Sequence, residues 1–548
     1  MDGFNLAEIH EAIAAIDPGR DCIVRGDRRF TWGDVTERTR RLANHLIAAG
    51  LGCHTERAGL AGWESGQDQL ALYLHNGNEY LEGMLGGYKA RCAPFNVNYR
   101  YVEEELLYLL DDAHATAIVY HAEFAPRLAA IRDRLPELRI LIQVADASGN
   151  ALLDGAVDYE DALAAASPER PDEALSGDDL YILYTGGTTG MPKGVLWRQH
   201  DIFMAALLPL SFVAKPPETV DDIVAQAGFA GMRMLAAPPF MHGAAHWMAF
   251  LTWHSGGTVV IQRDTVRLDP DDIWSTIERD KANALTIVGD AFARPLIDQL
   301  RVKSYDLSSL FLVVSGGAIL SQPLKAELLE LVPHVTIMDA VGASETGRQG
   351  GHSASAAGDV SSGHFAKDAN SVILDEDRTG LIEWPSEDVG WLGQRGAVPL
   401  GYLGDPDKSR ATFPEIDGVR YSTPGDRAQW IDADTYRLLG RDSVTINTGG
   451  EKVFAEEVEQ ALKYHPDVVD AVVAGRPSER WGSEVVAIVS LRPGSPATGD
   501  DLTEEASRHL ARFKLPKAYV FVDKVVRGPN GKADYRWAKQ TAGRPAAG

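Results

Sequence analysis

The chain has 548 residues, of which 45% are hydrophobic and 24% charged, and 53 basic residues against 78 acidic ones give a net charge of −25. These values are typical of a globular protein with a buried core, and the length predicts about three or four compact units. The negative charge argues against a nucleic-acid binder and against adsorption to anionic lipid, so local groups must hold any anionic substrate.

Short apolar runs alternate with longer amphipathic segments, which is the pattern of an α/β protein. Between two of these runs, residues 103–112 are predicted to form a helix, with leucines at 106, 107, 109 and 110. Strands are predicted at residues 71–74, 117–120, 140–144, 180–184, 258–262, 285–288 and 310–314. The stretch 353–370 is poor in large apolar residues and is interpreted as loops.

A separate set of predicted helices and strands begins near Gly440. The last part of the chain has its own predicted helix, at residues 455–463, and its own predicted strands, at 471–474 and 484–490. About 100 residues can form an independent domain. We therefore predict two domains, 1–439 and 440–548, with a hinge near residues 441–443.

Targeting and cysteine signals favour a cytoplasmic protein. The first residues lack the basic region and apolar run of a signal peptide. No stretch reaches the ~18 uninterrupted apolar residues that a membrane span needs, so no transmembrane segment is predicted. Cys22, Cys53 and Cys92 are scattered without metal-ligand or disulfide-framework spacing.

The most informative stretch is residues 184–195, which comes directly after a predicted strand. It contains four glycines, three threonines and one lysine within twelve residues. Glycines let backbone N–H groups approach phosphate oxygens closely, and the hydroxyls and the lysine add donors and charge. A flexible turn is the alternative. It is not a Walker A loop, because Pro192 precedes Lys193 and Gly194 follows it.

This segment resembles the phosphate loop of the adenylate-forming superfamily, which comprises acyl-CoA synthetases, aryl-CoA ligases, firefly-type luciferases and peptide-synthetase adenylation domains. Further motifs of that superfamily occur in the expected order over nearly the whole chain, at residues 315–318, 341–346, 421–426, 440–441, 447–453 and 529–532. Each motif alone is modest evidence. Their ordered co-occurrence identifies the chain as a member.

The resemblance implies a set of site residues. Nucleotide-binding roles fall on Thr185, Gly186, Gly187, Thr188, Thr189, Gly190, Lys193, Gly316, Gly317, Ala318, Val341, Gly342, Ser344, Asp426 and Arg441. Catalytic roles fall on Lys532, Glu345 and His242, Mg²⁺ binding on Glu345 and Thr188, and the thioester step on Gly449 and Gly450. For each single residue, a solvated loop position or a satisfied core position is the alternative. Val341 stands where an aromatic residue usually stacks on adenine.

The physical fit of these residue types supports the roles. A carboxylate such as Asp426 can accept two ribose hydroxyls, and Glu345 is a hard oxygen ligand suited to Mg²⁺. Arg441 supplies a fixed fork of donors. Lys532 comes after a Pro-Asn-Gly turn and is implied to contact both the substrate carboxylate and the α-phosphate.

The implied fold is α/β, with a large N-terminal domain of several subdomains and a small mobile α+β C-terminal domain. The large domain would contain mixed sheets sandwiched by helices and a small β-barrel. The implied activity is that of an ATP-dependent acyl-CoA ligase of fatty acid metabolism. A small-molecule carboxylic acid, ATP and CoA would be its substrates, with Mg²⁺ as cofactor, and a homodimer is compatible with the resemblance.

Residues 181–195, 289–295, 447–459 and 531–539 are most similar to bacterial, particularly actinobacterial, fatty-acyl and sterol side-chain CoA ligases. Three other functions stay open at this point: loading of a carrier protein in trans, a luciferase-like oxygenase and a degenerate nucleotide-binding protein. Residues 350–353 superficially resemble a phosphopantetheine attachment site, but they are interpreted as a loop of the large domain.

Overall fold

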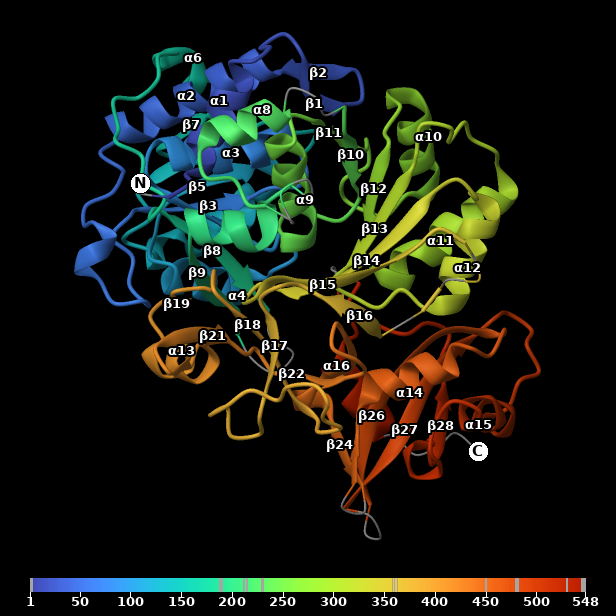
Figure 1. Ribbon diagram of the computed structural model, residues 1–548. Coiled ribbons are helices and arrows are strands. Elements are labelled where there is room, and N and C mark those ends of the chain that lie inside the picture. Colours follow the sequence, from blue (N-terminus) through green and yellow to red (C-terminus); the bar gives the residue numbers. More distant parts are fainter. Residues whose placement is uncertain are drawn as a thin grey trace.

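The protein is described by a computed structural model over residues 3–186, 191–209, 212, 215–227, 231–356, 358, 360–361, 363–448, 451–478, 482–528 and 531–543. Figure 1 shows a large body and, below it, a smaller unit formed by the last part of the chain. The large body contains a five-stranded sheet, a three-stranded sheet and a fifteen-stranded sheet among the described residues.

The five-stranded sheet forms one half of the large body. All its strands are parallel, in the order β4 (Ala93–Asn96), β3 (Gln69–Tyr73), β5 (Ala115–His121), β6 (Ile140–Val144) and β7 (Ala156–Asp158). Parallel strands need helical crossovers, which bury both faces of the sheet. The helices of this part are α1 (Leu6–Ala14), α2 (Trp32–Ala48), α3 (Asn78–Lys89), α4 (Glu103–Asp112), α5 (Ala125–Ile131) and α6 (Tyr159–Ala165).

The long sheet begins with a mainly parallel half. Its strands are, in order, β2 (Arg28–Thr31), β1 (Asp21–Arg25), β11 (Thr258–Ile261), β10 (Arg233–Ala236), β12 (Ala284–Ile287), β13 (Leu312–Gly316) and β14 (Thr336–Ala343). Helices α10 (Pro270–Asp280), α11 (Gly289–Val302) and α12 (Gln322–Leu331) pack on it and share one apolar core with its strands. The remaining helices of the large body are α7 (Gln199–Ile202), α8 (Val220–Ala227), α9 (Gly243–His254) and α13 (Pro406–Thr412).

The second half of the long sheet is antiparallel. It continues through β15 (Gly347–Ala354), β16 (His364–Lys367), β23 (Thr435–Arg441), β22 (Asp426–Trp430), β18 (Gly390–Arg395), β21 (Val419–Ser422) and β20 (Glu415–Ile416), with β17 (Ser371–Leu374) beside β18. The expected small β-barrel is corrected here. Among the described strands these form an open extension, because the path ends at β20 without returning to an earlier strand.

A short antiparallel sheet carries the glycine- and threonine-rich segment. Its order is β19 (Gly401–Tyr402), β9 (Lys193–Arg198) and β8 (Leu180–Thr185). The strand β8 pairs with β9 from Leu180 to Thr185, so the segment between them is the connection of a hairpin.

The smaller unit has its own apolar cores. One is formed only by residues between Val444 and Leu515, and another only by residues between Val472 and Ala542. Its strands are β24 (Ile446–Thr448), β25 (Glu451–Val453), β26 (Val468–Ser478), β27 (Gly482–Leu491) and β28 (Ala518–Phe521), and its helices are α14 (Ala455–Leu462), α15 (Gly499–Ser507) and α16 (Tyr535–Ala542). Separate cores are the property expected of a separate domain, and the unit is called the small domain below.

One expectation about loops holds for most of its segment, and another is wrong. Most described residues of 353–370 lie outside strands and helices, although the segment also contains the end of β15 and all of β16. Residues 350–353 lie within β15, paired with β14, and not in a loop. Ser353 pairs with Met338 of β14, so it does not lie in the loop that a prosthetic group would need.

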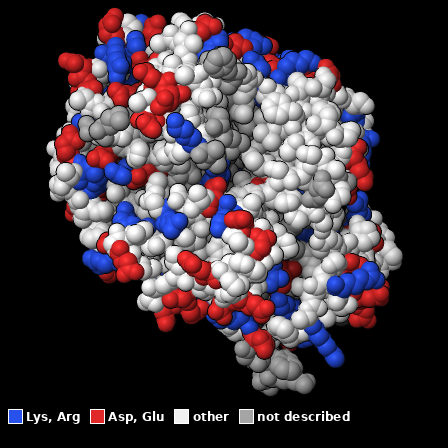
Figure 2. All heavy atoms as spheres, in the orientation of Figure 1, with Lys and Arg blue, Asp and Glu red and all other residues white. Residues whose placement is uncertain are grey.

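Figure 2 shows acidic and basic side chains interspersed over one face of the molecule, without a large basic patch. Anionic ligands must therefore find their cations in a local site. Within the described ranges, no helix combines the length and the apolar character that crossing a bilayer requires.

Candidate active site

Lys532 lies where the small domain meets the end of the long sheet, a junction called the cleft below. It ends a tight turn in which the Gly528 N–H donates to the Lys532 carbonyl at 2.8 Å. Gly531, at φ +72°, packs against the large body, because a Cβ there would lie 3.2 Å from Cγ1 of Val288. A Cβ built on Gly317 would lie 4.0 Å from Cε of Lys532. The small domain therefore delivers this lysine to the turn that ends β13.

Three charged residues, Glu345, Asp426 and Arg441, act electrostatically on the Lys532 ammonium. The Lys532 side chain is exposed to solvent, but the protein atoms gathered around it, followed by the Arg441 charge, lower its pKa to about 8, against the raising effects of Glu345 and Asp426. The structure thus brings four of the expected site residues into one electrostatic unit: Lys532, Glu345, Asp426 and Arg441.

Glu345 lies in the turn between β14 and β15 and is held at several points. The Tyr402 hydroxyl donates to Glu345 Oε1 at 3.0 Å, and the Ser422 hydroxyl donates to the Glu345 carbonyl at 2.5 Å. The neighbouring Ser344 carbonyl accepts from the Trp197 indole N–H at 2.9 Å. These bonds fix both the turn and the direction of the carboxylate.

The donor set at this turn fits a magnesium ion that is bound together with phosphate. Among the described residues, no group of three or more His, Cys, Asp or Glu side chains is arranged to hold a metal. Mg²⁺ commonly takes one or two carboxylates, substrate phosphates and waters. Glu345 can supply such a carboxylate, while the other expected ligand, Thr188, lies outside the described residues.

Asp426 and Arg441 begin and end two paired strands. They are cross-strand partners in β22 and β23, and the Arg441 Nε lies 3.4 Å from Asp426 Oδ1. The Asp442 N–H donates to the Gly425 carbonyl at 3.0 Å, which closes the pair at the point where the chain enters the small domain. The Asp426 charge, above all, raises the pKa of Arg441, so the guanidinium remains charged.

The turn after β13 presents open backbone beside Lys532. Gly317 has φ +84°, a left-handed conformation that favours glycine. The strand residue before it, Gly316, pairs with Ala340 of β14. Ala318 is half-buried and packs on the core beneath α11 and α12. Residues 316–318 thus form a shelf at the end of the sheet.

Two more expected residues, Val341 and Gly342, lie on the next strand, β14. A Cβ on Gly342 would lie 2.2 Å from the Gly347 carbonyl oxygen, so only glycine fits this hairpin. The side chain of Val341 packs against the cluster that contains Phe365, Ile373 and Tyr436. Part of its apolar surface is therefore used by the protein itself.

The phosphate-loop segment is described only at its two ends. Thr185 pairs with Lys193 across the hairpin, and Gly186 is exposed. The Lys193 ammonium forms an ion pair with Asp405 and lies 5.7 Å from the centre of the Tyr402 ring. Four expected residues lie outside the described part of the chain: Gly187, Thr188, Thr189 and Gly190.

His242 directly precedes α9 and His246 lies in the first turn of that helix, but their environments differ. His246 is fully satisfied, because its Nδ1 lies 2.6 Å from the Phe240 carbonyl and its Nε2 bonds to the Tyr181 hydroxyl. The buried Nε2 of His242 has no hydrogen-bond partner in the described structure. Burial, followed by the Lys532 charge, lowers the pKa of His242 to about 3, so it is neutral. Of the two histidines, His242 is the one with an unpartnered ring nitrogen among the described residues and with an electrostatic influence from Lys532.

The expected thioester-step residues, Gly449 and Gly450, lie outside the described residues. The strands on either side of them pair, with Thr448 opposite Glu451. In Figure 1 strand β24 lies at the end of the small domain that is remote from β13 and β14. The Lys532 side of the small domain, and not the β24 side, therefore faces the shelf at residues 316–318.

Three partners of the site were not anticipated from the sequence. They are Tyr402 and Ser422, which hold Glu345, and Asp405, which binds Lys193. Asp405 precedes a proline and caps α13, and this pattern predicts a helix start but says nothing of a lysine 212 residues away.

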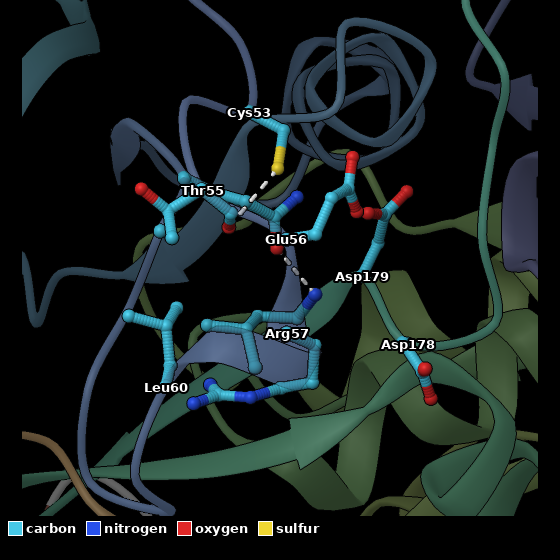
Figure 3. Close-up of a pocket in the computed structure, with 10 residues that line it drawn as sticks. Cys53, Thr55, Glu56, Arg57, Leu60, Asp178 and Asp179 are labelled. Carbon is cyan, nitrogen blue, oxygen red and sulfur yellow. Dashed lines mark hydrogen bonds between the residues drawn. The ribbon is translucent and has the colours of Figure 1, made fainter.

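A separate hollow lies on the five-stranded-sheet side of the large body, and Figure 3 shows its lining. Its free volume of about 10 Å³ is the size of one water. Two of its carboxylates, Glu56 and Asp179, are paired with Arg91 at 2.9 and 2.8 Å, and the third, Asp178, is paired with Arg198 at 3.0 Å. It has neither the room nor an unpaired carboxylate for a substrate.

Comparisons with known proteins agree with this arrangement. A family model described as AMP-binding enzyme matches residues 10–397, and one described as AMP-binding enzyme C-terminal domain matches residues 457–532. The chain is similar to the medium-chain acyl-CoA ligase Mig of Mycobacterium avium, at 52% identity over 541 residues and 98% of each chain. It is also similar to a medium/long-chain-fatty-acid–CoA/3-oxocholest-4-en-26-oate–CoA ligase of Mycobacterium tuberculosis, at 40% identity over 99% of this chain and 97% of the relative.

Solved structures share the fold. The crystal structure of the anthranilate CoA ligase AuaEII in complex with anthranoyl-AMP superposes with a TM-score of 0.80, at 21% identity, over 99% of this chain and 98% of that one. At such low identity the likeness is one of fold. The two-domain adenylate-forming architecture is therefore confirmed.

Proposed function

The chain belongs to the AMP-binding enzyme family and is an ATP-dependent acyl-CoA ligase, and from that premise we propose that it activates a medium- or long-chain fatty acid or a sterol side-chain acid. The names of its relatives in Mycobacterium support this substrate class. The observation that carries the proposed mechanism is the position of Lys532 beside Gly317, between the charges of Glu345, Asp426 and Arg441.

The first step would join the carboxylate to ATP. A carboxylate oxygen attacks the α-phosphorus, a P–O bond forms, and pyrophosphate leaves with the electrons of the broken bond. Lys532 would place its positive charge between the incoming carboxylate and the α-phosphate, which offsets the charge that develops in the transition state. Asp426 would accept the two ribose hydroxyls, and the shelf at residues 316–318 would pack against the adenine.

Mg²⁺ and the phosphate loop complete this proposal. Glu345 would hold Mg²⁺, which, when bound, neutralises charge on phosphate oxygens. Tyr402 would keep the Glu345 carboxylate in place through its hydrogen bond of 3.0 Å. The described ends of the loop, Thr185 and Lys193, flank the segment that would bind the leaving pyrophosphate.

The second step would transfer the acyl group to CoA. The CoA thiol gives up its proton to solvent, its sulfur forms a C–S bond with the acyl carbon of the adenylate, and the C–O bond to phosphate breaks, so that AMP leaves with the electrons of that bond. We propose that the small domain turns about residues 441–443, removes Lys532 and presents Gly449 and Gly450. His242, which is neutral and whose Nε2 has no partner within the described ranges, would lie beside the reacting acyl group.

The test is pyrophosphate release by the purified enzyme over a panel of carboxylic acids, with and without CoA. The panel runs from acetate through fatty acids of increasing length to a cholestenoate, and acyl-CoA is measured as product. We expect the best turnover with apolar acids of medium or greater length, and thioester only when CoA is present. Turnover of short or aromatic acids alone would refute the substrate class, and adenylate that only a carrier protein can discharge would refute CoA as acceptor.

Each chain carries both faces of the cleft, so one copy suffices for the reaction whether or not it forms the expected homodimer. We propose the cytoplasm as its location, where ATP, Mg²⁺ and CoA are available.

A further inference from the structure

The small domain contacts the large body at the first turn of α11 by two neighbouring contacts. The first is apolar: a Cβ on Gly531 would lie 3.2 Å from Cγ1 of Val288 and 3.4 Å from Cβ of Ala291. The second is ionic: the Lys463 ammonium lies 2.9 Å from Oδ2 of Asp290. Both belong to the arrangement in which Lys532 occupies the cleft.

Asp290 is a rigid anchor on the large body. Its Oδ1 accepts from the Ser321 N–H at 2.7 Å, and its own N–H donates to the Ile319 carbonyl at 3.2 Å. Its side chain is 7% exposed and that of Lys463 is 10% exposed, so the pair is largely shielded from water. An ion pair of this kind is sensitive to the loss of one partner, because the other charge is left buried.

From Lys463 the charges continue to the Lys532 turn. The Lys463 ammonium also lies 3.3 Å from Asp470, and Asp470 accepts two hydrogen bonds of 2.6 Å from Arg527. Arg527 in turn donates to the Gly531 carbonyl at 3.1 Å. Gly531 is the residue directly before Lys532. Alternating charges therefore connect Asp290 of the large body to the backbone that carries the lysine.

We propose that Asp290 and Lys463, acting through Asp470 and Arg527, are positioning residues that hold the small domain in the adenylate-forming arrangement and set Lys532 in the cleft. The pair joins the two domains, so a rotation that withdraws Lys532 must break it. The Asp290–Lys463 pair thus favours the first half-reaction over the second, and this inference rests on the proposed two-step mechanism.

The experiment measures the two half-reactions separately in Asp290→Asn and Lys463→Met. Adenylation is followed by pyrophosphate release without CoA, and the thioester step by turnover of supplied acyl-AMP with CoA. We expect adenylation to fall by about tenfold or more, the size of a typical coupling between sites. Thioester formation from acyl-AMP should be unchanged or faster, and the KM for ATP should change little, because the large body holds the nucleotide.

A double-mutant cycle and a matched control sharpen the test. The Asp290→Asn/Lys463→Met double variant should form the adenylate no more slowly than the slower of the two single variants, because each substitution removes the same interaction. Glu457→Gln removes an ion pair of 2.6 Å with Lys514 from α14, the helix that ends directly before Lys463, without touching the large body, and should leave both half-reactions unchanged.

Three outcomes would overturn the inference: equal loss of both half-reactions, loss of neither, or additive effects in the double variant. Retained turnover of acyl-AMP shows that a variant is folded. A wild-type enzyme that releases no pyrophosphate with any acid would instead overturn the proposed function, and the inference with it. Wild-type activity matched by both variants would overturn the inference alone.

Discussion

Lys532 of the small domain lies beside Gly317 of the large body, so close that a Cβ on that glycine would be 4.0 Å from Cε of the lysine. The two residues are far apart in the sequence, and only the packing of one domain on the other brings them together. The turn at Gly317 is left-handed, with φ +84°, and the glycine has no side chain to separate its backbone from the lysine. A lysine in this position meets the end of the sheet, where α/β proteins bind their ligands.

Replacement of this lysine should separate the two half-reactions. In Lys532→Ala, we expect adenylation to fall by at least about 100-fold, because one preorganised positive charge is lost from the transition state. Thioester formation from supplied acyl-AMP should remain within a few-fold of wild type. Pyrophosphate release and acyl-CoA formation, measured separately, check this.

The neighbouring basic residue Lys524 offers a control, since it lies outside the cleft motifs. Lys524→Ala should leave both half-reactions near the wild-type rates. If Lys532→Ala slowed both steps equally, its assignment to the first step would be wrong.

Adenylation should depend on pH through Lys532. The pKa of its ammonium is lowered to about 8, first by desolvation and then by Arg441, so the charged form is lost as the pH rises through that value. We expect kcat/KM for ATP in the adenylation assay to fall above about pH 8, while kcat falls only at higher pH because bound phosphates stabilise the ammonium.

Lys532→Arg is the control for this pH dependence. A guanidinium stays protonated over the whole range, so the descending limb should disappear even if the overall rate is lower. A limb that remained at the same pH in this variant would assign it to another group.

The sequence predicted the regular elements well where their pattern is local. The helix at residues 103–112 and the strand at 140–144 have the bounds that were expected, because the spacing of leucines and a continuous apolar run mark them. The strand β16 was missed because only one of its four residues is buried. This strand is held in place by its pairing with β15 and β23, and its own sequence carries no apolar pattern that would predict it.

The candidate active site shows the same difference between residues that the local sequence marks and residues that depend on tertiary contacts. The order of the motifs predicted Lys532, Glu345, Asp426 and Arg441 as site residues. In the structure, the last three act electrostatically on Lys532. Tyr402 was missed, because a hydrogen bond to a residue 57 positions away leaves no mark on local sequence. Motifs therefore predict the groups that meet the substrate, whereas the residues that orient those groups depend on tertiary packing.

Tyr402 should affect the magnesium requirement. Its hydroxyl donates to Glu345 Oε1 at 3.0 Å, so Tyr402→Phe frees the carboxylate to turn. Loss of such an outer-shell bond typically weakens metal affinity by about 10- to 100-fold. We expect the Mg²⁺ concentration for half-maximal adenylation to rise within that range, with full or nearly full activity recovered at saturating Mg²⁺.

A second tyrosine–carboxylate bond provides the comparison. Tyr305→Phe removes a hydrogen bond of 2.6 Å to Asp271 on α10, away from the cleft, and should leave the Mg²⁺ titration unchanged. An unchanged titration in Tyr402→Phe would show that Glu345 does not bind the ion.

Gly316, in the shelf at residues 316–318, and Gly342, on the neighbouring strand β14, should differ in their tolerance of a methyl group. A Cβ on Gly342 would lie 2.2 Å from the Gly347 carbonyl oxygen, a backbone atom that cannot move without opening the β14–β15 hairpin. A Cβ on Gly316 would lie 3.5 Å from the Ala340 carbonyl, an ordinary contact. Gly342→Ala should therefore lose about 1–3 kcal/mol of stability, the usual cost of overpacking, whereas Gly316→Ala should stay within about 1 kcal/mol of wild type. Denaturant unfolding of the two variants checks the difference, and equal stabilities would mean that the hairpin at Glu345 adapts more readily than its close packing implies.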